Sequence, residues 1–164
     1  MQDMTYDPRR ELRGKISGAR YALLLIQILT VVNLVMLLLD TGSFFLFSAS
    51  VPYYLTLLAM ALDNGFSSGA WVAGSHTYTA LIVSVVILTL YFLCWLRGKE
   101  RTGWLTGAMV LFLLDSLALV LVSYLLYGNP LANVLDLFVH GWALWSLWQG
   151  SKAGRQLREL EERK

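Results

Sequence analysis

Four long runs of apolar residues dominate the chain, and polar or basic residues flank each of them. The runs cover approximately residues 21–40, 78–96, 103–127 and 130–149. Each is close to the ~20 residues that an α-helix needs to cross the roughly 30 Å hydrocarbon layer of a bilayer. The pattern therefore predicts an all-α integral membrane protein, a bundle of four transmembrane helices that forms a single membrane domain over residues 1–164.

The segment between the first two runs, residues 41–77, is less regular. Its part 43–62 carries no charge and is long enough for a fifth crossing. However, it contains Pro52, and proline begins a helix more readily than it continues one. A fifth crossing would also separate the basic residues 97–101 from the basic N-terminus, against the positive-inside rule. We therefore predict a short re-entrant or interfacial helical segment on the outer side.

The distribution of basic residues predicts the orientation of the helices. All thirteen Lys and Arg residues lie in three segments, 1–20, 97–101 and 150–164. Basic segments that flank transmembrane helices stay in the cytoplasm. We therefore expect both termini to be cytoplasmic and the protein to reside in the cell (plasma) membrane, with the lipid bilayer as its surroundings. Because the positive-inside rule already accounts for the basic segments, we do not predict nucleic acid as a partner.

Composition supports the membrane class and narrows the chemistry. Hydrophobic residues make up 57% of the 164 residues, more than a soluble domain of this length can bury. Cys94 is the only cysteine, which excludes an intramolecular disulfide and a mechanism based on a cysteine pair. Zincin, serine-hydrolase and phosphate-loop motifs are all missing from the sequence, and it identifies no cofactor.

Ionisable residues within apolar runs are costly in hydrocarbon and raise a functional hypothesis. The last run contains Asp136 and His140, and the run before it contains Asp115. At 100° per residue, Asn133, Asp136 and His140 share one face of a helix, which we expect to turn into the bundle. Counted from the short turn between the two runs, Asp115 and His140 lie at similar depth. A carboxyl–imidazole hydrogen bond between them is feasible, either as a clamp between helices or as a proton relay.

An acidic vestibule is also predicted at the outer side, where the sequence places Asp40, Asp63, His76 and Asp136, with His140 below them and without any Lys or Arg. Such a vestibule would concentrate cations. Trp71 is expected to line it together with two tyrosines. The candidate ligand-binding residues are Asp40, Tyr53, Tyr54, Asp115, Asn133, Asp136 and His140.

Three functions from different classes follow. The first is the binding or transport of a cation or a proton-coupled small solute, with Asp136 and His140 as the relay pair, Asp115 as the deep proton acceptor and Asp40 as the entrance charge. Four helices enclose a narrow pathway, so this hypothesis includes a homodimer. The second is an accessory subunit that binds a lipid or a larger membrane partner through its outer segment. The third is an intramembrane enzyme with metal-activated water at Asp136 and His140, although no ligand spacing identifies the metal.

Overall fold

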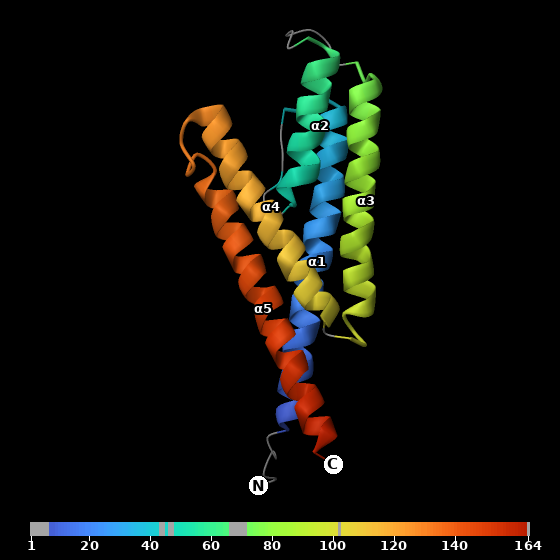
Figure 1. The fold of residues 1–164 in the computed structure, drawn as a ribbon, viewed down its shortest axis with the longest axis vertical. Coiled ribbons are helices and arrows are strands. Elements are labelled where there is room, and N and C mark those ends of the chain that lie inside the picture. Colours follow the sequence, from blue (N-terminus) through green and yellow to red (C-terminus); the bar gives the residue numbers. More distant parts are fainter. Residues whose placement is uncertain (1–6, 43–44, 46–47, 66–71, 102, 164) are drawn as a thin grey trace.

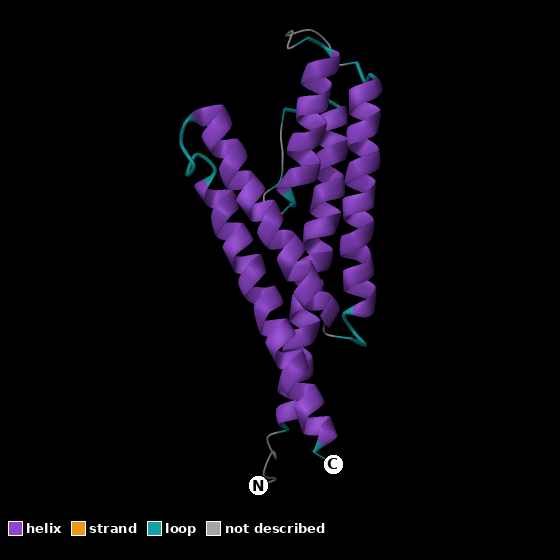
Figure 2. Cartoon of the chain, in the orientation of Figure 1, coloured by secondary structure: helices purple, strands orange, loops and turns teal. Residues whose placement is uncertain are grey.

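The computed structural model describes residues 7–42, 45, 48–65, 72–101 and 103–163. Within these residues the chain is all-helical, and turns and short loops join the helices (Figures 1 and 2). The five helices are α1 (Pro8–Leu38), α2 (Ser50–Asp63), α3 (Ser75–Arg97), α4 (Gly103–Tyr127) and α5 (Val134–Glu162).

Helix α1 begins at a cap that its sequence specifies. The Asp7 side chain accepts a hydrogen bond from the backbone N–H of Arg9 at 3.0 Å. Pro8 occupies the first helical position, where its missing N–H removes no helical hydrogen bond. The helix then runs without interruption from its basic start to Leu38. At 1.5 Å per residue, 31 residues span roughly 46 Å, which is longer than the hydrocarbon layer.

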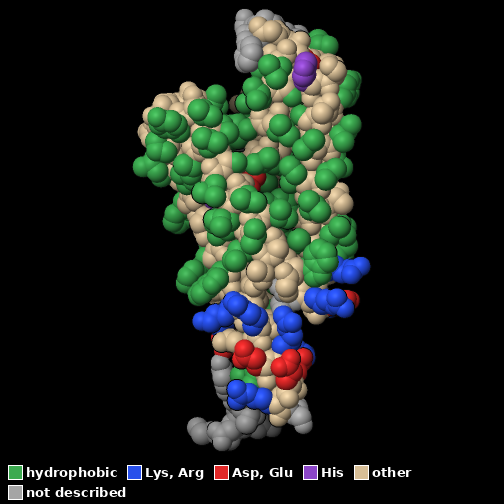
Figure 3. All heavy atoms as spheres, viewed as in Figure 1, with side chains coloured by type: hydrophobic (Ala, Val, Ile, Leu, Met, Phe, Trp, Pro, Cys, Tyr) green, Lys and Arg blue, Asp and Glu red, His purple; other side chains and the backbone are tan. Residues whose placement is uncertain are grey.

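Both termini lie at one end of the molecule, together with the turn between α3 and α4 (Figure 1). Lys and Arg side chains gather at this end, whereas apolar side chains are the most numerous of the coloured side chains over the rest of the visible surface (Figure 3). We call it the basic end. Helices α4 and α5 form a hairpin that diverges from the other helices toward the opposite end (Figure 1). The basic end is therefore polar, and the remainder of the surface has the apolar character that a bilayer requires.

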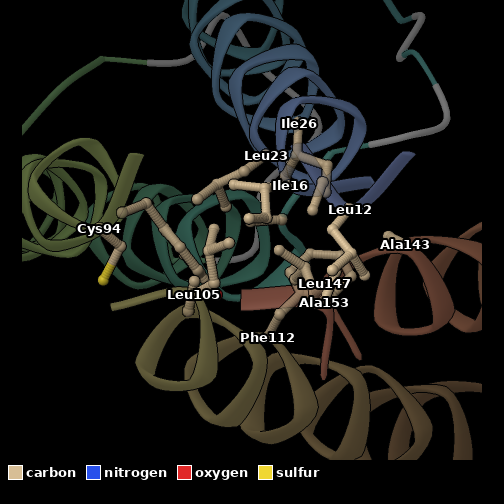
Figure 4. Packing of buried hydrophobic residues seen from close by; sticks show 14 residues of the cluster. Leu12, Ile16, Leu23, Ile26, Cys94, Leu105, Phe112, Ala143, Leu147 and Ala153 are labelled. Carbon is tan, nitrogen blue, oxygen red and sulfur yellow. The ribbon is translucent and has the colours of Figure 1, made fainter. Parts of the chain in front are cut away.

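The core lies where α1, α4 and α5 come together. Leu23 of α1, Leu105 and Phe112 of α4, and Leu147 of α5 are fully buried within one hydrophobic cluster (Figure 4). Near the basic end, α1 and α5 approach so closely that Gly150 faces Ala19 without room for a side chain. This contact fixes the position of α5, and with it the polar residues that α5 carries.

Three described helices, α1, α3 and α4, are long and apolar enough to cross a membrane. This supports the prediction of an all-α membrane protein. Helix α5 is not among them, and it carries Asp136 and His140 in its apolar part and several charged residues after Gly150. It also begins at Val134, four residues after the predicted start at residue 130, since the residues around Pro130 form a turn.

The chain between α1 and α3 enters the bundle and returns to the same end. Two side chains of α1 hold the entering segment: Asn33 exchanges hydrogen bonds with the backbone of Phe45, and Thr30 accepts one from the backbone N–H of Ala49 at 2.8 Å. Helix α2 then starts at Ser50 in the interior and ends beside the start of α3 (Figure 1). Its N-terminus is therefore buried in the middle of the molecule.

Candidate functional site

The buried N-terminus of α2 is capped by a side chain from another helix. Ser50 and Val51 donate their backbone N–H groups to the two carboxylate oxygens of Asp115, both at 2.8 Å. The first N–H groups of a helix have no partner within the helix, and the cap position of α2 holds Ala49, which has no polar side chain. Asp115 of α4 supplies the missing acceptor, and its charge is favourable at the positive end of the helix dipole.

His140 of α5 joins the same point and is almost completely buried. Its Nε2 lies 3.1 Å from Oδ2 of Asp115 and 3.2 Å from the hydroxyl of Ser50. Its Nδ1 lies 2.9 Å from the backbone carbonyl oxygen of Asp136. The imidazole also stacks on Phe112, with ring centroids 4.7 Å apart. Both ring nitrogens and the stacked face of the imidazole therefore contact residues of α2, α4 or α5.

These contacts constrain the hydrogen atoms on the ring of His140. A backbone carbonyl oxygen only accepts hydrogen bonds, so Nδ1 of His140 carries a hydrogen. Oδ2 of Asp115 already accepts the N–H of Ser50. A hydrogen bond between Nε2 and Oδ2 then requires one more proton, held either by the imidazole or by the carboxyl group. In both cases the Asp115–His140 pair is neutral overall, which suits its burial.

Asp136 completes a cluster with Asp115 and His140, but its own side chain is not satisfied. Its Oδ1 lies 3.7 Å from Nδ1 of His140, beyond hydrogen-bond distance. This oxygen is buried and has no hydrogen-bond partner among the described residues. An ionised Asp136 would therefore be a buried charge without a hydrogen-bonded counterion, which is an expensive arrangement.

A second polar contact lies one helical turn before Asp136. Asn133 donates to the hydroxyl of Ser123 on α4 at 2.9 Å and to the hydroxyl of Tyr54 on α2 at 3.2 Å. The ring of Tyr54 packs edge-on against Tyr53. Asn133 and Tyr54 thus join α2 to α5 on the side of the cluster that faces away from the basic end.

The remaining predicted residues do not join the cluster. Asp40 lines a separate cavity of about 180 Å³ between α1 and α2, together with Tyr53. Asp63 and His76 instead form a contact at the end opposite the basic end, with 2.7 Å between Oδ1 and Nδ1. Trp71 lies outside the described residues. Among the described residues, Asp40 and the Asp63–His76 contact therefore lie apart from the cluster of Asp115, His140 and Asp136.

Asp63 serves as the N-terminal cap of α3. Its carboxylate accepts the backbone N–H groups of Gly74, His76 and Thr77, and the hydroxyl of Thr77. The hydrogen bond from the Thr77 hydroxyl, with help from the backbone N–H groups and His76, lowers the pKa of Asp63 well below its usual value. This pattern is that of a structural cap, and it gives Asp63 no free oxygen for a ligand.

Two members of the cluster were not predicted from the sequence. Ser50 and Phe112 contact His140 directly, yet neither has a distinctive sequence pattern. The only available signal for Ser50 is its position two residues before Pro52, which is typical of the first turn of a helix. Phe112 is one of several large apolar residues in its run, and nothing in the sequence separates it from the others.

The described residues include no group of three or more His, Cys, Asp or Glu side chains placed to hold a metal ion. The hydrogen bonds explain this finding. Both nitrogen atoms of His140 and both carboxylate oxygens of Asp115 already have partners.

The cluster joins three helices through buried ionisable groups, and its geometry is the basis for assigning a function. Comparison with known proteins gives no match, since no family model, no curated protein and no solved structure is similar to this chain.

Proposed function

We propose that α1, α3, α4 and α5 all cross the cell membrane, with both termini in the cytoplasm. The gathering of Lys and Arg at the basic end supports this orientation (Figure 3). Helix α5 lies along α1 and α4, and it turns Asp136 and His140 into the bundle. In this topology α2 is a re-entrant helix from the outer side, and the two described residues directly before it, Ser48 and Ala49, are buried, as a bilayer demands of non-helical backbone.

Cysteine labelling of intact cells tests this topology. In a Cys94→Ser background, single cysteines replace Asn129 in the turn before α5 and Arg155 near the basic end. An impermeant thiol reagent should label Asn129→Cys from outside, and should label Arg155→Cys only after the membrane is permeabilised. Labelling of both cysteines, or only of Arg155→Cys, in intact cells would contradict the proposed orientation.

For the site, we propose that the protein binds a proton at the Asp115–His140–Asp136 cluster and couples this binding to the uptake of a cation or small solute. The observation that carries the proposal is the buried, unpartnered Oδ1 of Asp136, 3.7 Å from the Nδ1 of His140. A clamp between helices would satisfy all its polar groups. Asp136 is not satisfied, whereas its neighbours in the cluster are.

Proton uptake by Asp136 removes the main electrostatic cost of the cluster. Because Asp115 and His140 are together neutral, an ionised Asp136 would give the cluster a net negative charge in apolar surroundings. A proton or another cation compensates that charge. Nε2 and Oδ2 of the pair beside it lie 3.1 Å apart, so a movement of less than an ångström at Asp136 is enough to connect three proton-accepting groups in a row.

The path to this cluster runs from the end opposite the basic end. Within the described residues no Lys or Arg lies on that side, so cations meet no repulsion there. Tyr54 and Asn133 stand between that end and Asp136, and they provide a hydroxyl and an amide for a solute or for water. The outer side is therefore the side from which the cluster is filled.

Infrared difference spectroscopy of the protein in lipid tests proton binding without knowledge of the solute. Spectra recorded between about pH 5 and about pH 8, the interval in which histidine ordinarily titrates, should show the carbonyl band of a protonated carboxyl group. Asp136→Asn should remove this band, whereas Glu100→Gln, an exposed residue outside the cluster, should leave it unchanged.

Proton flux then tests coupling. In liposomes with an internal pH-sensitive dye, Asp136→Asn should lose solute-dependent proton uptake, and Glu100→Gln should retain it. An unchanged carboxyl band in Asp136→Asn would refute the proposed proton site. If Asp136→Asn loses the band but the wild type shows no proton flux with any cation or solute of a panel, transport is refuted. The protein would then bind a proton without transporting a solute.

A further inference from the structure

A hollow of about 980 Å³ lies between α3 and α4 near the basic end. Its wall is mainly apolar and includes Leu90, Val110 and Leu111. Gly107 of α4 also lines it, and a Cβ atom at this position would meet only the sulfur of Cys94, at 4.0 Å. The volume is in the range of small-molecule binding sites. We call this hollow the α3–α4 groove.

The polar rim of the groove is basic. Arg101 and Arg158 lie at the rim together with Glu100 and the indole of Trp104. A second hollow of about 480 Å³ shares Arg158 and Glu100 with the groove. Its charged residues are four basic and two acidic, a positive surplus of two: Arg13, Arg20, Lys99, Arg158, Glu100 and Glu161.

We propose that the α3–α4 groove binds an anionic phospholipid, with an acyl chain along the apolar wall and the phosphate at the rim formed by Arg101 and Arg158. The arrangement of apolar wall and basic rim matches the two parts of such a lipid. The rim lies at the basic end, where the apolar surface of the molecule stops (Figure 3). An exposed tryptophan at this level, Trp104, is typical of the interface between lipid and water.

Charge decides between this ligand and the alternatives. A cytoplasmic leaflet offers anionic lipids, and each Lys or Arg near its surface attracts them. A zwitterionic lipid would fill the groove without using the positive surplus at the rim. A free phosphate would use the rim and leave the apolar wall exposed, which is unfavourable for a wall of this size. The groove is separate from the Asp115–His140–Asp136 cluster, because none of these three residues lines the groove or the second hollow.

Native mass spectrometry of the full chain in mild detergent tests the proposal, with phosphatidylglycerol as the probe. The wild type should bind one phosphatidylglycerol molecule in preference to phosphatidylcholine. Arg101→Gln should weaken binding about fivefold, as expected for one basic residue at an anionic surface. Arg155→Gln is the matched control, because Arg155 is exposed at the same end but lines neither hollow, and it should bind like the wild type.

A second pair of variants tests the apolar wall without changing charge. Gly107→Phe places a ring in the groove and should abolish binding of phosphatidylglycerol, whereas Leu114→Phe, on the exposed apolar surface of α4, should bind normally. Unfolding followed by tryptophan fluorescence verifies that all four variants fold. Equal binding of phosphatidylcholine, or competition by inorganic phosphate alone, would overturn the proposal. A wild-type dimer that Gly107→Phe converts to a monomer would assign the groove to a second copy of the chain.

Discussion

Nε2 of His140 lies 3.1 Å from Oδ2 of Asp115, although the two residues are 25 positions apart and belong to different helices. The same carboxylate holds the first N–H groups of α2. A single carboxyl group therefore links three helices, and the imidazole connects it to Asp136. The position of α2 and the protonation of the cluster depend on each other, because a proton added to Asp115 would weaken its hold on the positive helix end.

Asp115→Asn should destabilise the protein more than Asp136→Asn. An asparagine at position 115 retains one acceptor and loses the charge that two backbone N–H groups share, and hydrogen bonds to charged groups contribute about 1.5–3 kcal/mol each. We expect a loss of about 2 kcal/mol in the free energy of unfolding for Asp115→Asn. Asp136→Asn breaks no hydrogen bond to Oδ1 and should change stability by less than about 0.5 kcal/mol.

Unfolding in mixed micelles of a mild detergent and dodecyl sulfate, followed by tryptophan fluorescence, measures both variants. Asp115→Ala extends the series, because it leaves both N–H groups without an acceptor and should cost more than Asp115→Asn. If Asp136→Asn destabilises the protein as strongly as Asp115→Asn, Asp136 is part of the structural clamp, and the proposed proton site loses its main support.

The long apolar elements and the similar depth of Asp115 and His140 follow from simple features of the sequence, whereas the meeting of their two faces does not. The helix Gly103–Tyr127 coincides with an apolar run bounded by glycine and a turn. The short turn after Tyr127 makes α4 and α5 antiparallel neighbours, so the rise of 1.5 Å per residue places the two side chains at the same depth. The run of apolar residues and the short turn were enough to predict these helices and the common depth of the two side chains.

The junction with α2 could not be predicted in the same way. The segment before Ser50 has no helical or strand periodicity, and its position depends on long-range hydrogen bonds from Thr30 and Asn33. Polar side chains at such positions in an apolar run usually hold helices together, and the sequence does not indicate that these two bind a loop backbone. The acidic vestibule was predicted only from the distribution of charged residues along the chain. In the structure Asp40 lies just after α1 and Asp63 caps α3, so both are separated from Asp136.

Asn33→Ala should destabilise the protein far more than Gln27→Ala, although both amides are buried on α1. Asn33 bonds to the backbone N–H and carbonyl of Phe45 and to the hydroxyl of Ser48. Each buried group left without a partner costs about 1–3 kcal/mol, so Asn33→Ala should lower the free energy of unfolding by about 3 kcal/mol. Gln27 only donates to a carbonyl of its own helix, that of Leu23, and its loss should cost about 0.5 kcal/mol.

The same micelle titration measures this pair, and hydrogen exchange locates the effect. In Asn33→Ala the amides at the start of α2 should exchange faster, because the segment that leads to Ser50 has lost its hold. Similar stability losses for Asn33→Ala and Gln27→Ala would show that the entering segment does not depend on α1.

Asp63 should stabilise the end opposite the basic end in a pH-dependent manner. Because the hydrogen bond from Thr77 and its neighbours lowers the pKa of Asp63 below the ordinary value of 3.8, the folded state binds the proton less readily than the unfolded state. The stabilisation is thus fully present above pH 3.8 and is lost as the pH falls through the lowered pKa. The difference in melting temperature between wild type and Asp63→Asn should be constant at neutral pH and should shrink below about pH 4.

Asp40→Asn is the matched control for this prediction, because Asp40 is also an aspartate at a helix end but is exposed. Its melting temperature should follow that of the wild type at every pH. A constant difference between wild type and Asp63→Asn down to the most acidic condition would mean that the capping bonds do not depend on the charge of Asp63.

The close approach of α1 and α5 should make Gly150 more sensitive to substitution than Gly141, which lies on the same helix. A Cβ atom at position 150 would overlap the Cβ of Ala19, and it would lie 3.4 Å from the backbone oxygen of Lys15. Gly150→Ala must therefore push α5 away from α1, and overpacking of this kind costs about 1–3 kcal/mol. Gly141 has no atom within 4 Å of its ideal Cβ position, so Gly141→Ala should be neutral or stabilising by up to about 1 kcal/mol, since alanine favours the helix.

Because α5 carries Asp136 and His140, displacement at Gly150 should also weaken the proton-dependent carboxyl band. Equal stability of the two alanine variants would show that α1 and α5 are not packed at this distance.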